Sequence, residues 1–333
     1  MKVKIFMSSG GSAQERNLLL SLGHGIRKCL MASDDLGSAK GTSARIGRWR
    51  KQEQPANHVE LVYDDGYSEC DVAVIFGSWK PRDKGTHVTR TSVALNAERF
   101  LVIETPLLNR RTAETNDHWR IGVNGFLNDA AHWPTMTAGA ADQRLIDLGV
   151  EWTGWRGQES GHIVVALQLP GDASLRGIDI NEWAYETVTG LRQHTDRVIV
   201  IRGHPLAAHR AWSDHESLAA RLAQRSIQNL VFSDGYLVPW HYDLNGAYCT
   251  VTYTSGLAVD SVVCGVPTIA CDPGNFAWSV SSNFVEEVND LRRPDDAVMI
   301  DWLRQLATCQ WSVSEMRDGT AWQALLPVLE QTQ

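Results

Sequence analysis

The residues best suited to chemistry in this chain follow a run of β-branched residues near position 255. The sequence VTYTSG reads as a strand that ends in Thr254, Ser255 and Gly256, and the residues after it have helical periodicity. A helix start carries backbone N–H groups without internal partners and the positive end of the helix dipole. We therefore expect this turn to hold a phosphate group, with a simple helix N-cap as the alternative interpretation of Ser255.

A second strand, VIVI, ends in Arg202, Gly203, His204 and Pro205. Arginine pairs well with phosphate, and histidine supplies a donor that titrates near neutral pH. A surface ion pair is the alternative for Arg202, and a hydrogen-bonded strand-end histidine is the alternative for His204. If both strands belong to one parallel sheet, their carboxyl ends lie at the same edge, and the two motifs form one anion site.

Strands alternate with helices along most of the chain, which predicts an α/β fold with parallel, doubly wound sheets. At 333 residues the chain suits two domains, and the polar, Gly-rich stretch 151–160 reads as a linker. We therefore expect two Rossmann-like domains, 1–155 and 156–333, that face each other across a cleft. Strand ends of the first domain would reach this cleft through Gly10, Gly11 and Glu104.

Composition is that of an ordinary soluble protein, with a net charge of -8. The basic stretch 40–51 could still contact phosphates and stack on a base, although a solvated loop is the simpler interpretation. The six cysteines form no CxxC pair, no metal cluster is visible, and the first strand is too short for a signal peptide. No apolar run reaches membrane-spanning length. We expect a cytoplasmic protein that binds neither membrane nor metal.

The C-terminal half, over roughly 162–275, resembles the GT-B glycosyltransferases, in particular the capsule-polysaccharide and sialyltransferase-like branch with an HP motif and a serine motif. His204-Pro205 matches the first motif and Thr254-Ser255-Gly256 the second. The resemblance implies a nucleotide-sugar donor (UDP, GDP or CMP), no separate cofactor and no metal. It also implies that His204 stabilises the leaving nucleotide and that Asp260, on the same helix face as Gly256, holds the ribose.

Because the turn that contains Gly10 and Gly11 ends a strand at the cleft, we expect these two residues to contact the donor. The resemblance further implies that the N-terminal half supplies the catalytic base. Asp64-Asp65-Gly66 is similar to the acidic-acidic-Gly motif of HP-motif sialyltransferases, which favours Asp65; a turn between two strands is the alternative. Glu104, at the end of the strand FLVIE, is the second candidate. We favour an inverting mechanism, whereas a retaining enzyme would use a different constellation.

Three stretches, DVAVIFGSWK, HTDRVIVIRGHP and DPGNFAW, are similar to glycosyltransferase-like proteins of tailed phages. This implies a 5-hydroxymethylpyrimidine in double-stranded phage DNA as the acceptor and the host cytoplasm as the location. Arg48, Lys80 and Arg120 are the expected acceptor-binding cations, with solvated side chains as the alternative.

Other classes remain open or are disfavoured by the motifs. A surface polysaccharide is the second acceptor class, a sugar-nucleotide epimerase uses the same fold, and a nucleotide- or DNA-binding protein without catalysis is the non-enzymatic alternative. The chain has no GxGxxG fingerprint, no P-loop and no GxSxG motif.

Overall fold

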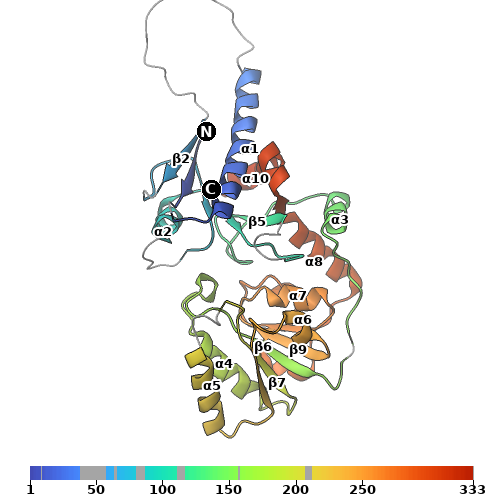
Figure 1. Cartoon of the computed structure of the whole chain (residues 1–333). Coiled ribbons are helices and arrows are strands. Elements are labelled where there is room, and N and C mark those ends of the chain that lie inside the picture. Colours follow the sequence, from blue (N-terminus) through green and yellow to red (C-terminus); the bar gives the residue numbers. More distant parts are fainter. Residues whose placement is uncertain are drawn as a thin grey trace, which may run out of the picture. The chain divides into compact units, whose positions relative to one another are not determined.

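A computed structural model describes most of the chain and divides it into two compact units (Figure 1). The described residues are 1–8, 10–37, 58–63, 66–79, 87–110, 117–156, 158–206 and 212–332. Unit 1 comprises 1–126, 130–137 and 308–333, and unit 2 comprises 127–129 and 138–307. This division differs from the expected 1–155 and 156–333, because the C-terminal residues return to unit 1.

Unit 1 is built on a six-stranded sheet in the order β11-β5-β4-β3-β1-β2. Its strands are β1 (Lys2–Met7), β2 (His58–Tyr63), β3 (Val72–Phe76), β4 (Phe100–Glu104), β5 (His118–Val123) and β11 (Gln310–Ser312). The first four run parallel, which confirms the expected parallel sheet, whereas β5 and β11 are antiparallel additions. Strand β5 is almost entirely buried in the sheet although its sequence, HWRIGV, includes polar and aromatic residues.

The helices of unit 1 come from both ends of the chain: α1 (Ala13–Gly37), α2 (His87–Asn96), α9 (Val313–Asp318) and α10 (Thr320–Gln331). Gly25 in α1 lies so close to α9 that a Cβ atom there would be 2.0 Å from the Met316 carbonyl oxygen. Gly319, with a φ of 98°, leaves similar room for Cys29. These small residues let the C-terminal helices pack directly on α1.

Unit 2 contains a five-stranded, fully parallel sheet in the order β10-β9-β6-β7-β8. Its strands are β6 (His162–Ala166), β7 (Ile199–Arg202), β8 (Leu230–Ser233), β9 (Ala247–Thr252) and β10 (Thr268–Ala270). The chain order reverses between β6 and β9, as it does in Rossmann folds. The predicted doubly wound fold is confirmed for this half of the chain.

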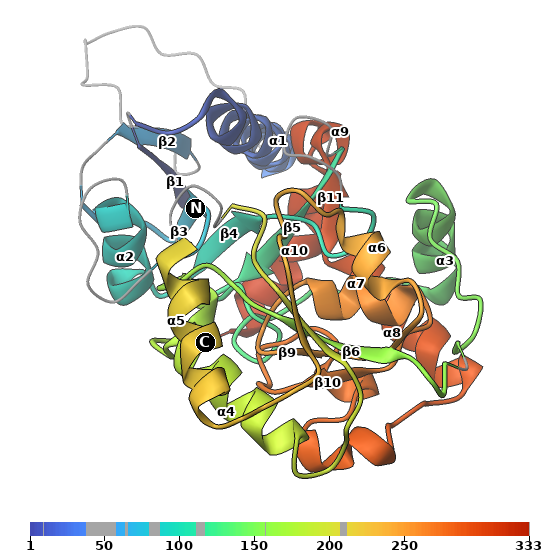
Figure 2. The same cartoon turned by 60° about the horizontal axis from the view of Figure 1, so that its bottom comes forward.

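Helices cover both faces of the sheet in unit 2. The helices of this unit are α3 (Ala138–Asp147), α4 (Ile180–Leu191), α5 (Trp212–Gln224), α6 (Trp240–Leu244), α7 (Leu257–Val263) and α8 (Asp296–Thr308), with short 3-10 turns at Ala173–Leu175, Trp278–Val280 and Val285–Asn289. Of these, α4 and α5 pack on one face of the sheet, and α6 and α7 pack on the other. Figure 2 shows α4 and α5 side by side. Residues Ile163 and Val165 of β6 pack toward these two helices, and Val164 and Ala166 pack toward α6 and α7. This alternation fixes the direction of the strand ends that carry the candidate site.

Candidate functional site

The carboxyl ends of β6 and β9 flank the point where the strand order of unit 2 reverses, which is where open α/β sheets bind ligands. Gln168, two residues after β6, bridges this point. Its Nε2 donates to Oγ1 of Thr254 at 3.0 Å, and its Oε1 accepts from the Thr254 backbone N–H at 2.9 Å. Oγ1 of Thr254 in turn donates to the Ser174 carbonyl oxygen at 3.0 Å. Thr254 is therefore a buried positioning residue.

The next two residues are placed differently. The hydroxyl of Ser255 accepts from the Leu257 backbone N–H at 3.2 Å, and both Ser255 and Gly256 are half-buried. Among the described residues, none accepts a hydrogen bond from the backbone N–H of Ser255 or of Gly256. Two consecutive amide donors thus stand at the turn, as an anion site requires. Asp260 lies half-buried one helical turn further on.

His204 follows β7 at the same edge of the same sheet. Its Nδ1 accepts a hydrogen bond from the Leu206 backbone N–H at 3.1 Å. In the neutral ring, an Nδ1 that accepts this bond leaves the proton on Nε2. Since β6 alone separates β7 from β9, the His204 and Ser255 strand ends lie two strand spacings apart, roughly 10 Å.

The partners of the Arg202 side chain differ from those that the sequence predicted. Its side chain is buried; Nη1 donates to the Asp243 carboxylate, and Nη2 donates to the Val238 carbonyl oxygen at 2.8 Å and to that of Gly235 at 3.3 Å. Asp243 also accepts from the Ser233 hydroxyl at 2.7 Å. The guanidinium group is directed into the protein, so Arg202 has a structural role and not the expected role of a phosphate ligand. It holds the loop from 235 to 243 beside the His204 turn.

A polar cluster that the sequence did not single out follows β9 and β10. Tyr253 donates to Asp272, and burial together with this hydrogen bond raises the pKa of Tyr253 to about 12. Arg176 forms ion pairs with Asp129 and, at 3.5 Å, with Asp272. Arg176 also has a left-handed φ of 54°. The cluster connects the loop after β6 to the loop after β10.

Asn275 fixes the second of these loops. It is fully buried, and its Nδ2 donates to Oγ1 of Thr252 at 2.9 Å and to the Tyr253 carbonyl oxygen at 3.0 Å. The signal for this cluster was present in the sequence. The stretch DPGNFAW follows a strand directly, and polar residues in such positions mark a sheet edge that binds or positions a ligand.

In unit 1 the strand order reverses between β1 and β3. The Gly-rich turn after β1 lies there: the Gly11 backbone N–H donates to the Ser8 carbonyl oxygen at 3.0 Å, and Gly10 is exposed. A Cβ atom on Gly11 would lie 2.9 Å from the carboxylate of Glu15, which is buried and pairs with Arg90 at 3.3 Å. The turn therefore packs on an ion pair, and its contact with a donor stays a prediction.

Glu104 and Arg120 lie opposite each other on β4 and β5, with Oε2 of Glu104 3.7 Å from Nη2 of Arg120. Nη1 of Arg120 donates to the Phe126 carbonyl oxygen at 2.7 Å. Burial lowers the pKa of Arg120, and the Glu104 carboxylate opposes that shift. Arg120 is thus a buried partner of Glu104, whereas we expected it to bind the acceptor or to be solvated.

Several predicted residues lie outside the described residues: Arg48, Asp64, Asp65 and Lys80. Within the described parts of the chain, no group of three or more His, Cys, Asp or Glu side chains is spaced to hold a metal ion. Of the helices in those parts, none has both the length and the hydropathy needed to cross a bilayer.

Comparison by sequence gives no relatives: no protein-family model and no curated protein matches the chain. Comparison by structure gives neighbours of low similarity. Two are KpsC enzymes of Thermosulfurimonas dismutans. The β Kdo 2,4 transferase is 14% identical over 75% of this chain and 83% of that one, with a TM-score of 0.43. The β Kdo 2,7 transferase is 10% identical over 97% and 99%, with a TM-score of 0.47.

A third neighbour is S. aureus MnaA, solved with UDP. It is 9% identical over 100% of this chain and 98% of that one, with a TM-score of 0.34. At these identities and scores the comparisons establish neither a family nor an activity. An assignment of function therefore rests on the residues of the chain itself.

Proposed function

We propose that this protein is a glycosyltransferase that takes a sugar from a nucleotide-sugar donor and that the donor phosphate binds at the carboxyl edge of the sheet in unit 2. One observation carries the proposal: the Ser255 and Gly256 amides have no described acceptor, and they lie at the same sheet edge as the His204 turn. Three donors around a site that flanks the reversal of strand order suit an anionic phosphate. Two Rossmann-like units are the architecture of GT-B enzymes.

The reaction balances as a single displacement. The acceptor oxygen attacks the anomeric carbon, the bond from that carbon to the phosphate oxygen breaks, and the nucleotide leaves with the electron pair. His204 and the turn amides stabilise the charge on the leaving phosphate, as preorganised donors do. The acceptor proton passes to a carboxylate, for which Glu104 and Asp65 are the candidates. Asp260 would hold the ribose, and inversion at the anomeric carbon follows from a single attack.

The proposal also concerns the chemical identity of the acceptor. A 5-hydroxymethylpyrimidine in phage DNA, modified in the host cytoplasm, is the acceptor that the sequence favoured. It draws no support from the described cations, because Arg120 pairs with Glu104 and the other two predicted ligands lie outside the described residues. A saccharide hydroxyl is the alternative acceptor.

A thermal-shift panel with UDP, GDP, CMP and their sugars tests the donor site on the wild type and on His204→Ala. A ligand that binds only the folded protein raises its melting temperature. We expect one nucleotide to raise it in the wild type and to raise it less in the variant. His194→Ala changes an exposed histidine after α4, so it is a control that should respond like the wild type.

Other outcomes lead elsewhere. No shift with any nucleotide would remove the donor site and the transferase with it. Interconversion of a free sugar nucleotide without acceptor would identify an epimerase. Nucleotide binding without turnover, with or without His204, would identify a binding protein.

A further inference from the structure

Gln168 lies in a chain of hydrogen bonds whose donors all point the same way. The Thr254 backbone N–H can only donate, so the Gln168 side-chain oxygen faces it at 2.9 Å. The Gln168 amide nitrogen donates to the Ser174 hydroxyl at 2.8 Å, and that hydroxyl donates to Oδ1 of Asp172 at 2.6 Å. Hydrogen bonds aligned in this way polarise one another, and this chain ends on a carboxylate. The Gln168 carboxamide is thereby fixed in one orientation.

The loop after β6 is shaped so that Ser174 returns to Gln168. Asp172 caps a short 3-10 turn in this loop by accepting a hydrogen bond from the Ser174 backbone N–H at 2.8 Å. Arg176 ends the turn with a φ of 54° and forms an ion pair with Asp272 at 3.5 Å. The loop is therefore anchored on both sides of Ser174, which keeps the acceptor of the Gln168 amide nitrogen in place.

Thr254 is the residue that this loop holds. Gln168 accepts from its backbone N–H, and the Ser174 carbonyl oxygen accepts from its Oγ1 at 3.0 Å. On the other side of the turn, the first backbone hydrogen bonds of α7 fix the carbonyl oxygens of Ser255 and Gly256. The two amides without a described acceptor thus lie between two fixed points, so they keep their direction before any ligand binds.

We propose that Gln168 is a positioning residue of the donor site: it fixes Thr254, so that the next two amides stay aimed at one point. Gln168 is only 7% exposed and acts through the Thr254 backbone, without contact to the donor. The inference rests on the proposed function and deepens it, because it assigns the rigidity of the phosphate turn to a residue of another strand end. Thr254→Val keeps the backbone bond to Gln168 and should keep nucleotide affinity, whereas a variant of Gln168 should not.

Gln168→Met tests the proposal, because methionine has a similar length but forms neither hydrogen bond. We expect it to weaken binding of the nucleotide that the thermal-shift panel identifies by about tenfold, the effect of losing one hydrogen bond. Affinity for the matching nucleoside, which lacks the phosphate, should stay the same, whereas a general loss of structure would weaken both ligands. Isothermal titration calorimetry measures both affinities. Gln193→Met makes the same change at an exposed residue after α4 and should have no effect.

A second measurement on the full chain needs no nucleotide. Backbone amide relaxation, measured by NMR, reports fast motion of single N–H groups. We expect the amides of Ser255 and Gly256 to move more in Gln168→Met than in the wild type, because one of their two fixed points is lost.

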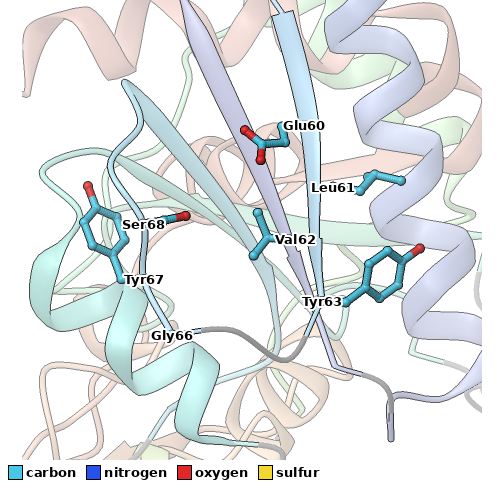
Figure 3. A pocket seen from close by; sticks show the side chains of 7 residues that line it. All are labelled: Glu60, Leu61, Val62, Tyr63, Gly66, Tyr67 and Ser68. Carbon is cyan, nitrogen blue, oxygen red and sulfur yellow. The ribbon is translucent and has the colours of Figure 1, made fainter.

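Ser174→Ala is a milder change to the same chain of hydrogen bonds. It removes the acceptor of the Gln168 amide nitrogen but leaves the bond from the Thr254 backbone, so we expect a smaller loss of nucleotide affinity, about threefold. Ser68→Ala is its matched control in unit 1. Ser68 is also half-buried and accepts a side-chain hydrogen bond, from Nζ of Lys4 at 2.7 Å, and it lines a pocket beside β2 (Figure 3). This control should bind nucleotide like the wild type.

Equal losses of nucleotide and nucleoside affinity, or unchanged motion of the two amides, would show that Gln168 is only structural and would overturn the inference. Unchanged nucleotide affinity in Gln168→Met overturns it as well. If circular dichroism shows that Gln168→Met does not fold, Ser174→Ala decides by the same measurements. A wild type that binds no nucleotide removes the proposed donor site and this inference with it. A wild type and a Gln168→Met variant that bind nucleotide equally remove only this inference.

Discussion

Gly235 packs so closely against Gly203 that a Cβ atom on Gly235 would lie 1.8 Å from the Gly203 carbonyl oxygen. Gly203 precedes His204, so this contact sets where the histidine turn lies. The Arg202 side chain reaches the same loop through the carbonyl oxygens of Gly235 and Val238. Backbone packing and a buried arginine thus hold the turn from two sides.

Replacing Gly235 with alanine should displace the His204 turn. The methyl group would overlap backbone atoms, which are not free to rotate away, and overpacking of this kind costs about 1–3 kcal/mol. We expect weaker nucleotide binding together with a lower melting temperature, measured by the thermal-shift panel. Gly139→Ala is the matched control, because no atom lies within 4 Å of its Cβ position. Nucleotide binding that survives Gly235→Ala unchanged would separate the His204 turn from the donor site.

Arg202→Met should destabilise unit 2 rather than only weaken nucleotide binding. Loss of the guanidinium group leaves the Asp243 carboxylate, which is 11% exposed, without its cation. Breaking a buried ion pair in this way costs about 3–5 kcal/mol. Urea unfolding measures the difference. Arg221→Met removes an arginine from an exposed pair with Glu182 and should cost about 1 kcal/mol or less. A stable Arg202→Met protein that has lost only its nucleotide affinity would restore Arg202 as a phosphate ligand.

Substitutions of the neighbouring residues Thr254 and Ser255 should affect different properties, namely stability for Thr254 and nucleotide affinity for Ser255. Thr254→Val removes the hydroxyl that bridges Gln168 and Ser174, and an unsatisfied buried group costs about 1–3 kcal/mol. Ser255→Ala loses only the hydrogen bond from the Leu257 backbone N–H, worth about 1 kcal/mol. We therefore expect the first variant to lower the melting temperature and the second to lower nucleotide affinity. The reverse result would move the phosphate contact from Ser255 to Thr254.

Glu104→Gln should slow sugar transfer by about 100-fold or more if Glu104 is the general base. Nucleotide binding in unit 2 should be unchanged, and Glu98→Gln, on an exposed residue of the same unit, should have no effect. Steady-state rates with the identified donor check this. A double variant with Arg120→Met separates the two roles. If the pair is only structural, the stability loss of the double variant is smaller than the sum of the single losses and the rate stays near that of the wild type.

Tyr253 should make unit 2 sensitive to alkaline pH. Burial and the hydrogen bond to Asp272 raise its folded pKa from the ordinary value of about 10 to about 12, so the folded state favours the neutral phenol. Its stability contribution is complete below pH 10 and is lost as the pH rises through 12. Unfolding curves of the wild type should fall more steeply over this range than those of Tyr253→Phe. Parallel curves would show that Tyr253 titrates as it does in the unfolded chain.

The sequence by itself determined the local structure and the composition of the two strand-end motifs. Periodicity and Gly-rich turns predict the parallel strands of both units, because side chains alternate in a strand and repeat along a helix within a few residues. The same local rules place Ser255 and His204 at strand ends. They also identify a Gly-rich turn after the first strand.

Only the tertiary structure decided which of these side chains point outward. Arg202 meets Asp243, 41 residues later, and Arg120 meets Glu104, so two predicted ligands become internal partners. The return of α9 to α1 depends on close approach at Gly25. Each of these depends on groups distant in sequence that compete to satisfy a buried charge or to fill a volume, and local pattern does not encode that competition.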